Sequence, residues 1–239
     1  MQTIVTAEYG SRAIGVATGD SDHDLMSVFV EDPEYVLGIE TIDTHASSTA
    51  AAGARSTHQD TDITRYPLRK WAKLAAVGNP TVLLLLFLEP LDSTGHWEML
   101  KGIRDAFVSR EAGRRFQGYS LGQREAMVGM RNKRTNRPEL IHKHGYDTKF
   151  AYHMVRTAMQ GVELMTTGAL RLPMAPGDLE VLRSIRAGAM SKDAVLDLAS
   201  SLDSDLTVAI ARAQVNDQPD RMLINDTLHR IYLDAWASR

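Results

Sequence analysis

The sequence predicts an α+β protein in which a small mixed β-sheet with flanking helices is followed by a helical domain. Strand-like alternation is confined to the first third of the chain, whereas helical periodicity dominates after about residue 95. The length of 239 residues and the hydrophobic content of 44% are enough for a substantial core. We therefore expect a strand-containing core at 1–94 and a helical domain at 95–239 that closes a cleft.

Three segments of the first domain have the pattern of strands. Residues 3–9 form the first, and residues 23–30 alternate and then become continuously apolar, as a partly buried strand does. The third lies at 56–66. A short helix is expected at 12–17. The stretch from Thr44 to Arg55 has no clear period and is predicted to be a mobile loop.

Helical spacing begins after the third strand. Leu68, Trp71 and Leu74 share one face, and Gly78-Asn79-Pro80 ends this helix. The apolar run from Val82 to Leu88 is expected to lie in the core. Further helices are predicted at 146–167, at 176–187, at 191–214 and from about residue 220.

Composition restricts the classes of function. The formal charge of −3 gives no bulk attraction to nucleic acid or to an anionic membrane, so such binding needs a local patch. The chain has no cysteine, which excludes disulfides, thiolate zinc sites and cysteine nucleophiles. The N-terminus does not resemble a signal peptide, and the longest apolar run is too short to span a bilayer. These observations predict a cytoplasmic protein without a membrane partner.

Residues suited to phosphate and metal chemistry lie near the N-terminus. Gly10-Ser11-Arg12 follows a predicted strand, where glycine lets the backbone approach an anion. Asp22 and Asp24, two apart, project from one face of an extended segment and suit Mg²⁺. Each motif alone is common in ordinary turns. A third carboxylate from the next strand would complete a site for metal-assisted phosphoryl transfer.

Two residues compete for this third position. Asp62 is well placed, and Asp60 is the alternative because it lies two residues away on the same face of the predicted strand. The alternative to a metal site is a set of unrelated acids in turns and strands.

The helical half contains two groups of basic residues. Lys149, His153 and Arg156 share one stripe of a helix, which is either a solvated face or a surface for an anion. The stretch 124–144 is either a phosphate track for RNA or DNA or a solvated linker. It contains Arg124, Arg131, Lys133, Arg134, Arg137 and Lys143 with two histidines. His142-Lys143-His144 is interpreted as a surface loop rather than a metal cluster.

The segment Tyr9-Gly-Ser-Arg-Ala-Ile-Gly-Val-Ala-Thr-Gly-Asp-Ser-Asp-His-Asp-Leu resembles the signature of the DNA polymerase β-type nucleotidyltransferase superfamily. More narrowly, the chain is similar to the bacterial and phage group of nucleotidyltransferases associated with RNA-repair gene sets (RlaP-like). The likeness continues in Asp62-Ile-Thr-Arg-Tyr-Pro-Leu-Arg-Lys-Trp, in Gly78-Asn79-Pro80 and in the segments that begin at Gly145 and Glu163. It covers most of the chain.

The resemblance implies roles for individual residues. Asp22 and Asp24 would bind two divalent ions, Mg²⁺ or Mn²⁺, and Asp62 would complete the second site, where the attacking hydroxyl loses its proton. The β- and γ-phosphates of a nucleoside triphosphate (NTP) would lie against Gly10 and Ser11, with Arg12 nearby. The same resemblance favours a phosphate-binding role for three residues of the helical domain, Lys149, His153 and Arg156.

The expected activity is transfer of a nucleoside monophosphate from an NTP to a hydroxyl group, with release of pyrophosphate. The favoured acceptor is an RNA end, bound through the basic stretch 124–144. Two alternatives stay open. The same chemistry on a protein side chain or a small molecule is one, and a nucleotide-binding antitoxin-like or regulatory protein without activity is the other.

Overall fold

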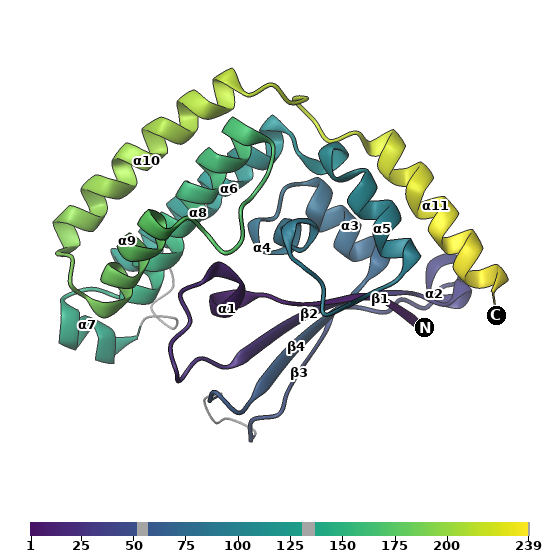
Figure 1. Ribbon diagram of the computed structural model, residues 1–239, viewed down its shortest axis with the longest axis horizontal. Coiled ribbons are helices and arrows are strands. Elements are labelled where there is room, and N and C mark those ends of the chain that lie inside the picture. Colours follow the sequence, from purple (N-terminus) through teal and green to yellow (C-terminus); the bar gives the residue numbers. More distant parts are fainter. Residues whose placement is uncertain (52–56, 131–136, 239) are drawn as a thin grey trace. The chain divides into compact units, whose positions relative to one another are not determined.

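The computed structural model describes residues 1–51, 57–130 and 137–238, and it confirms the α+β class. A five-stranded mixed sheet has the order β3-β4-β2-β1-β5 (Figure 1). Strand β2 pairs in parallel with β4, and the other neighbours are antiparallel. The strands are β1 (Gln2–Glu8), β2 (His23–Val30), β3 (His45–Ser48), β4 (Thr61–Pro67) and β5 (Asp92–Ser93).

Two strands were not predicted, the two-residue β5 and the edge strand β3. The loop expected from Thr44 to Arg55 contains the edge strand β3, so the loop prediction is wrong for His45–Ser48. The strand is short and mostly exposed, and its histidine, alanine and serines give no apolar alternation. Its pairing with β4 holds it in place, which is a tertiary effect. Residues 52–56 of the same prediction lie outside the described residues.

The contacts along the chain define two compact units. The strand-bearing unit comprises Met1–Val77, Thr81–Phe107 and Pro219–Arg239, and the helical unit comprises Gly78–Pro80 and Val108–Gln218. The sequence predicts a division at residue 94. In the structure, residues 95–107 and the C-terminal helix α11 (Arg221–Ala237) belong to the strand-bearing unit. The C-terminal helix joins this unit because it contacts helices α3 (Leu68–Ala76) and α5 (Gly95–Gly102).

Apolar side chains of the strand-bearing unit form a core around two tryptophans. Trp71 and Trp97 are fully buried and meet edge to face at 5.1 Å, and Phe107 packs on Trp71. All residues of the run from Val82 to Leu88 except Phe87 are buried, as predicted. The helical elements here are α1 (Gly10–Ile14), α2 (Pro33–Leu37), α3 (Leu68–Ala76), α4 (Pro80–Leu83), η1 (Leu84–Phe87), α5 (Gly95–Gly102), η2 (Arg104–Phe107) and α11 (Arg221–Ala237).

A buried carboxylate attaches α11 to the end of β2. Glu31 accepts a hydrogen bond from the Tyr232 hydroxyl at 2.6 Å and another from the Leu68 backbone N–H at 3.0 Å. The Tyr232 oxygen in turn accepts from the Arg69 N–H. Burial and the bond to Glu31 raise the pKa of Tyr232 far above its usual value, so the hydroxyl remains a donor.

We expect Tyr232→Phe to lower the free energy of unfolding by about 1–3 kcal/mol, because it removes a donor from a buried carboxylate. Urea unfolding followed by circular dichroism measures the change. Tyr119→Phe is the matched control, since Tyr119 is exposed. Equal stabilities for the two variants would contradict the role of the Glu31–Tyr232 contact.

The helical unit is built around one central helix. Helix α8 (Thr148–Thr167) packs against α6, α9 and α10 (Figure 1). Asp147 caps its N-terminus by accepting from the N–H groups of Lys149 and Phe150, and Gly168 ends it. The other helices are α6 (Arg110–Met127), α7 (Pro138–His144), α9 (Pro176–Ala187) and α10 (Lys192–Arg212). None of the described helices combines the length and apolarity that crossing a bilayer requires.

Candidate metal centre

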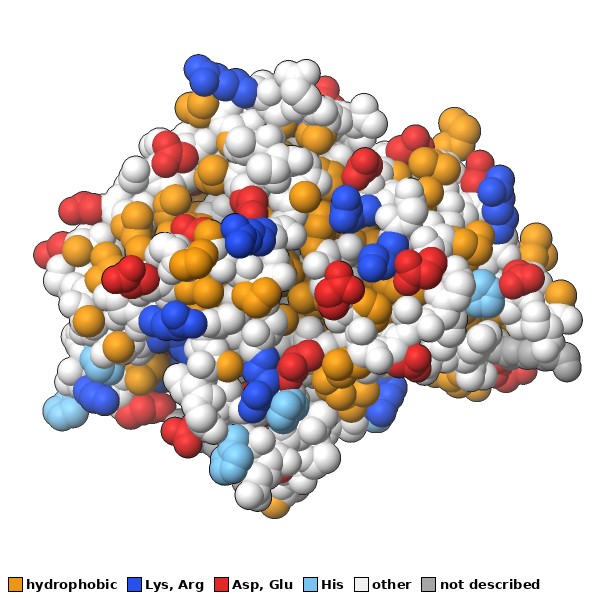
Figure 2. Space-filling view, viewed as in Figure 1, with side chains coloured by type: hydrophobic (Ala, Val, Ile, Leu, Met, Phe, Trp, Pro, Cys, Tyr) orange, Lys and Arg blue, Asp and Glu red, His pale blue; other side chains and the backbone are white. Residues whose placement is uncertain are grey.

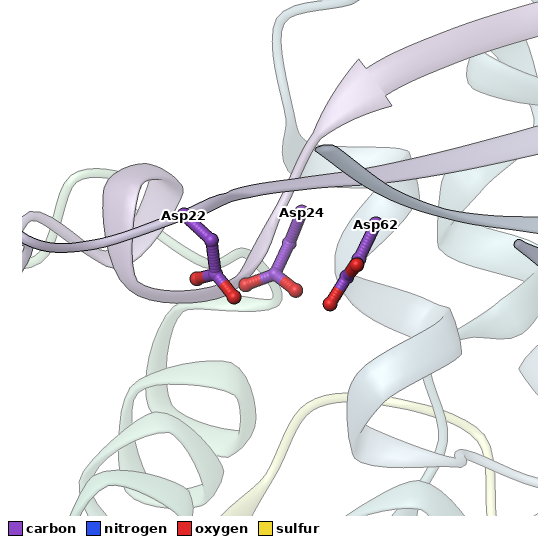
Figure 3. A group of neighbouring side chains, drawn as sticks. All are labelled: Asp22, Asp24 and Asp62. Atoms are coloured by element: carbon purple, nitrogen blue, oxygen red, sulfur yellow. The ribbon is translucent and has the colours of Figure 1, made fainter. Parts of the chain in front are cut away.

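Three carboxylates meet at the start of neighbouring parallel strands. Asp24 on β2 lies opposite Asp62 on β4, and Asp22 immediately precedes β2. One carboxylate oxygen from each residue lies within 4.8 Å of the others. Figure 3 shows all three side chains pointing to the same side of the strands. Among the described residues, this is the one cluster of three or more acidic or histidine side chains with such spacing.

The geometry separates Asp62 from its competitor. Asp60 precedes β4 and turns its carboxylate into the connection before that strand. It accepts hydrogen bonds from the Thr57 N–H at 2.9 Å and from the hydroxyls of Thr57 and Thr49. These bonds lower the pKa of Asp60. Asp62, in contrast, belongs to the acidic cluster, so Asp62 is the third carboxylate.

Glycine at position 10 is required by the close approach of Asp24. Gly10 has φ +68°, a conformation that other residues rarely adopt. A Cβ atom there would lie 2.8 Å from Asp24 Cγ and closer still to a carboxylate oxygen. The Tyr9 N–H donates to the Asp24 carbonyl at 2.8 Å and fastens the turn to β2. The turn and the acidic pair predicted from sequence therefore form one structural unit.

Arg12 supports the loop that carries Asp22. Its guanidinium donates to the Ser21 carbonyl at 2.7 Å and to the Asp22 carbonyl at 3.0 Å. Glu8 lies 3.6 Å from the same guanidinium and 2.7 Å from His23 Nδ1. The structure thus gives Arg12 a positioning role, and phosphate binding by Arg12 stays a prediction.

A cavity of about 330 Å³ adjoins two of the three carboxylates. Its wall mixes polar and apolar side chains and includes Ser47 and Ser48 of β3, a strand that was not predicted. Burial and the negative charges of Asp24 and Asp62 raise the pKa of Tyr9, whereas a hydrogen bond with Thr64 lowers it. The net shift is upward, so the phenol stays protonated. The cavity is lined by Tyr9, Asp24, Ala46, Ser47, Ser48, Asp62, Ile63 and Thr64.

The predicted basic stripe lies on α8, within the helical unit. Lys149 is exposed, whereas Arg156 is only 7% exposed and His153 is partly buried. Glu163 accepts from the Arg171 N–H at 3.2 Å. Phosphate binding by these residues stays a prediction.

Burial and the positive charges of Arg156, Lys149, Arg137 and Arg186 lower the pKa of His153 to about 3. The ordinary value is 6.5, so the unfolded chain binds more protons than the folded chain between these limits. Stability should therefore fall as the pH is lowered through this window. The wild type should lose free energy of unfolding between about pH 7 and pH 5. We expect His153→Gln to make this loss smaller by about 2 kcal/mol.

Urea unfolding at the two pH values measures this loss. His229→Gln, at an exposed position on α11, is the control and should retain the wild-type pH dependence. An unchanged pH dependence in His153→Gln would contradict a lowered pKa of this imidazole in the folded chain.

The described residues of the predicted basic stretch 124–144 belong to more than one structural element, including the end of α6 and helix α7. Arg131, Lys133 and Arg134 of this stretch lie outside the described residues. Arg137 pairs with the buried Asp147 at 3.2 Å. His142-Lys143-His144 is the last turn of α7 and not the predicted loop, because Gly145 in a left-handed conformation ends a helix there. On the face drawn in Figure 2, Lys and Arg side chains are scattered among acidic ones.

Comparison with known proteins assigns the chain to a family of the DNA polymerase β type. The model of the RNA repair pathway DNA polymerase β family (RlaP) matches residues 1–230, and the chain belongs to this family. The family predicted from the sequence motifs is confirmed.

Two individual proteins are similar to the chain. An uncharacterized 38.9 kDa protein of Enterobacteria phage T4, from the nrdC-mobD intergenic region, is 30% identical over 115 residues. The match covers 46% of this chain and 34% of the phage protein, about a third of that protein's length. A nucleotidyltransferase-like protein from Exiguobacterium sibiricum 255-15 aligns with a TM-score of 0.31 at 9% identity, covering 100% of this chain and 75% of that one.

Proposed function

We propose that the chain transfers a nucleoside monophosphate from an NTP to a hydroxyl group of an RNA end and releases pyrophosphate. The observation that carries this proposal is the convergence of Asp22, Asp24 and Asp62, whose carboxylate oxygens lie within 4.8 Å of one another. The family membership supports the reaction class, and the family's RNA-repair description supports the acceptor.

The acidic cluster fits divalent ions by its chemistry. All three donors are carboxylate oxygens, which Mg²⁺ and Mn²⁺ prefer. Three negative charges this close repel one another, and a cation bound among them would offset that repulsion. When bound, two ions would neutralise charge at the α-phosphate and acidify the attacking hydroxyl. Asp22 and Asp24 would hold both ions, and Asp62 would complete the second site.

The chain's own residues would position the reactants. Gly10 leaves space beside Asp24, and Arg12 fixes the loop of Asp22. In the proposed reaction the acceptor oxygen bonds to the α-phosphorus, the bond to the bridging oxygen breaks, and pyrophosphate leaves. The acceptor hydroxyl would enter the cavity beside Asp62. Gly10, Ser11 and Arg12, with Lys149, His153 and Arg156, are proposed to bind phosphates.

The test is incubation with each NTP labelled at the α-phosphorus, with Mg²⁺ and a mixture of RNA ends. Under the proposal, RNA becomes labelled and unlabelled pyrophosphate is released. If label appears in protein or in a small molecule and none appears in RNA, the proposed RNA acceptor is wrong and the proposed transfer reaction stands. Absence of transfer to every acceptor class, with Mg²⁺ or Mn²⁺, would overturn the proposal.

A further inference from the structure

The cavity beside the acidic cluster presents hydroxyl groups next to its carboxylates. Its lining includes the carboxylates of Asp24 and Asp62 and the hydroxyl groups of Tyr9 and Thr64. Asp62 and Thr64 are two residues apart on β4, so their side chains lie on one face of the strand, about 7 Å apart along it. A ligand that enters the cavity therefore meets a carboxylate and, one step further along β4, a pair of hydroxyl groups.

The phenol of Tyr9 has a proton to donate to such a ligand. Its oxygen is hydrogen-bonded with the Thr64 hydroxyl, and this bond lowers the pKa of Tyr9. A hydrogen bond has that effect when the phenol oxygen accepts it, so Thr64 is the donor. Burial and the nearby carboxylates outweigh this bond and raise the pKa overall, so the O–H persists. The Tyr9 O–H is thus a donor that the bond with Thr64 does not use.

The serines of β3 have a different task. The Ser47 oxygen accepts from the Arg65 guanidinium at 3.1 Å. The Ser48 oxygen accepts from the Ala50 N–H, also at 3.1 Å. Both bonds hold the edge strand and the turn after it, so recognition of a ligand is assigned to the hydroxyl groups on the other side of the cavity.

The cavity has room for one small group. Its volume of about 330 Å³ lies at the lower end of the range for ligand pockets, about 300–1,000 Å³. Ala46 lies opposite Thr64 in the β3–β4 ladder and contributes only a methyl group to the wall there. Such a space suits one terminal sugar of a nucleic acid.

We infer that Tyr9 and Thr64 recognise the 2′-hydroxyl of an RNA 3′ end whose 3′-hydroxyl lies at Asp62. The inference rests on the proposed function and deepens it, because it makes the acceptor a ribose with two free neighbouring hydroxyl groups. The 2′-hydroxyl is the group by which a protein distinguishes RNA from DNA. The Tyr9 O–H donates to its oxygen. A 2′-deoxyribose leaves this donor without a partner, which selects against DNA ends.

The test compares two short RNA oligonucleotides that differ only in the 3′-terminal sugar, ribose in one and 2′-deoxyribose in the other. Fluorescence anisotropy measures binding with Mg²⁺ and without NTP, and α-labelled NTP gives kcat/KM for transfer. We expect the wild type to favour the ribose end about tenfold or more in both measurements.

Tyr9→Phe should reduce this preference to about twofold or less, because it removes the donor to the 2′-hydroxyl. Thr64→Val should have the same effect, since it removes the bond that orients the phenol. With the 2′-deoxyribose end, both variants should stay within about twofold of the wild type. A bond that only fastened Tyr9 to β4 would, when lost, weaken binding and transfer equally for the two ends.

Tyr66→Phe is the matched control. Tyr66 is also on β4, and it is partly buried like Tyr9, but it is not among the residues that line the cavity. The variant should keep the wild-type preference for the ribose end.

The inference is overturned if the wild type shows no preference, if Tyr9→Phe keeps it, if both ends lose equally, or if neither oligonucleotide binds. Failure of the proposed reaction is separate, because the binding measurement needs no transfer. A ribose preference in binding that depends on Tyr9, with no acceptor labelled, would leave this site standing and overturn the reaction. Equal transfer to both ends by the wild type would do the reverse.

Discussion

Asp24→Asn should reduce nucleotidyl transfer by at least about 10²–10³-fold, the loss typical of removing one charge-stabilising group from an active site. Asp24 is the central carboxylate of the cluster, because it lies opposite Asp62 and next to Gly10. The amide has a similar shape but no charge, so the fold should persist while affinity for the cation falls. Transfer of α-labelled NTP to the acceptor measures the effect, and circular dichroism checks the fold.

Asp60→Asn is the matched control for this variant. Asp60 lies two residues before Asp62, but its carboxylate is bonded to Thr57 and Thr49 and takes no part in the cluster. Its transfer rate should stay within about threefold of the wild type, as expected for a surface substitution away from the site. A loss as large as that of Asp24→Asn would show that the third carboxylate has been misassigned.

Gly10→Ala should lower transfer by about 10²-fold and the free energy of unfolding by about 1–3 kcal/mol. The added methyl group would overlap the Asp24 carboxylate, and the residue would have to keep φ near +68°. Either Asp24 moves out of the cluster or the turn changes its backbone. Steady-state transfer kinetics and urea unfolding of the same preparation measure both effects.

Gly19→Ala provides the comparison for Gly10→Ala. Gly19 lies in the connection between α1 and β2, its φ is not positive, and a Cβ there would meet no atom within 4 Å. This variant should be as active and as stable as the wild type. Full activity in Gly10→Ala would mean that the close approach of the turn to Asp24 is unnecessary for function.

Local patterns were sufficient to predict that Asp22 and Asp24 lie together in the strand-bearing unit. The alternation in 23–30 predicted β2 with its observed bounds, and the spacing of Asp22 and Asp24 placed both on the side that Asp62 also faces. The choice of Asp62 over Asp60 could not be made from sequence, since both fit one face of a strand. The structure decides it because the strand begins at Thr61 and the turn before it binds the Asp60 carboxylate.

Features that depend on tertiary contacts were missed. Strand β3 has no apolar period and exists through pairing with β4, so Ser47 and Ser48 were not recognised as cavity residues. Gln160 was not singled out either, because a lone glutamine on a helix is usually solvated. Its 1% exposure becomes visible only once α8 is packed among its neighbours, although its spacing of four residues from Arg156 was available.

The central claim is that Asp22, Asp24 and Asp62 form a divalent-metal site. Its most direct test is electron paramagnetic resonance of Mn²⁺ titrated into the protein with a non-hydrolysable NTP, because the result does not depend on the acceptor. The account predicts saturable Mn²⁺ binding in the wild type and in Asp60→Asn, weakened by about tenfold or more in Asp24→Asn. Equal Mn²⁺ binding by all three proteins would contradict it.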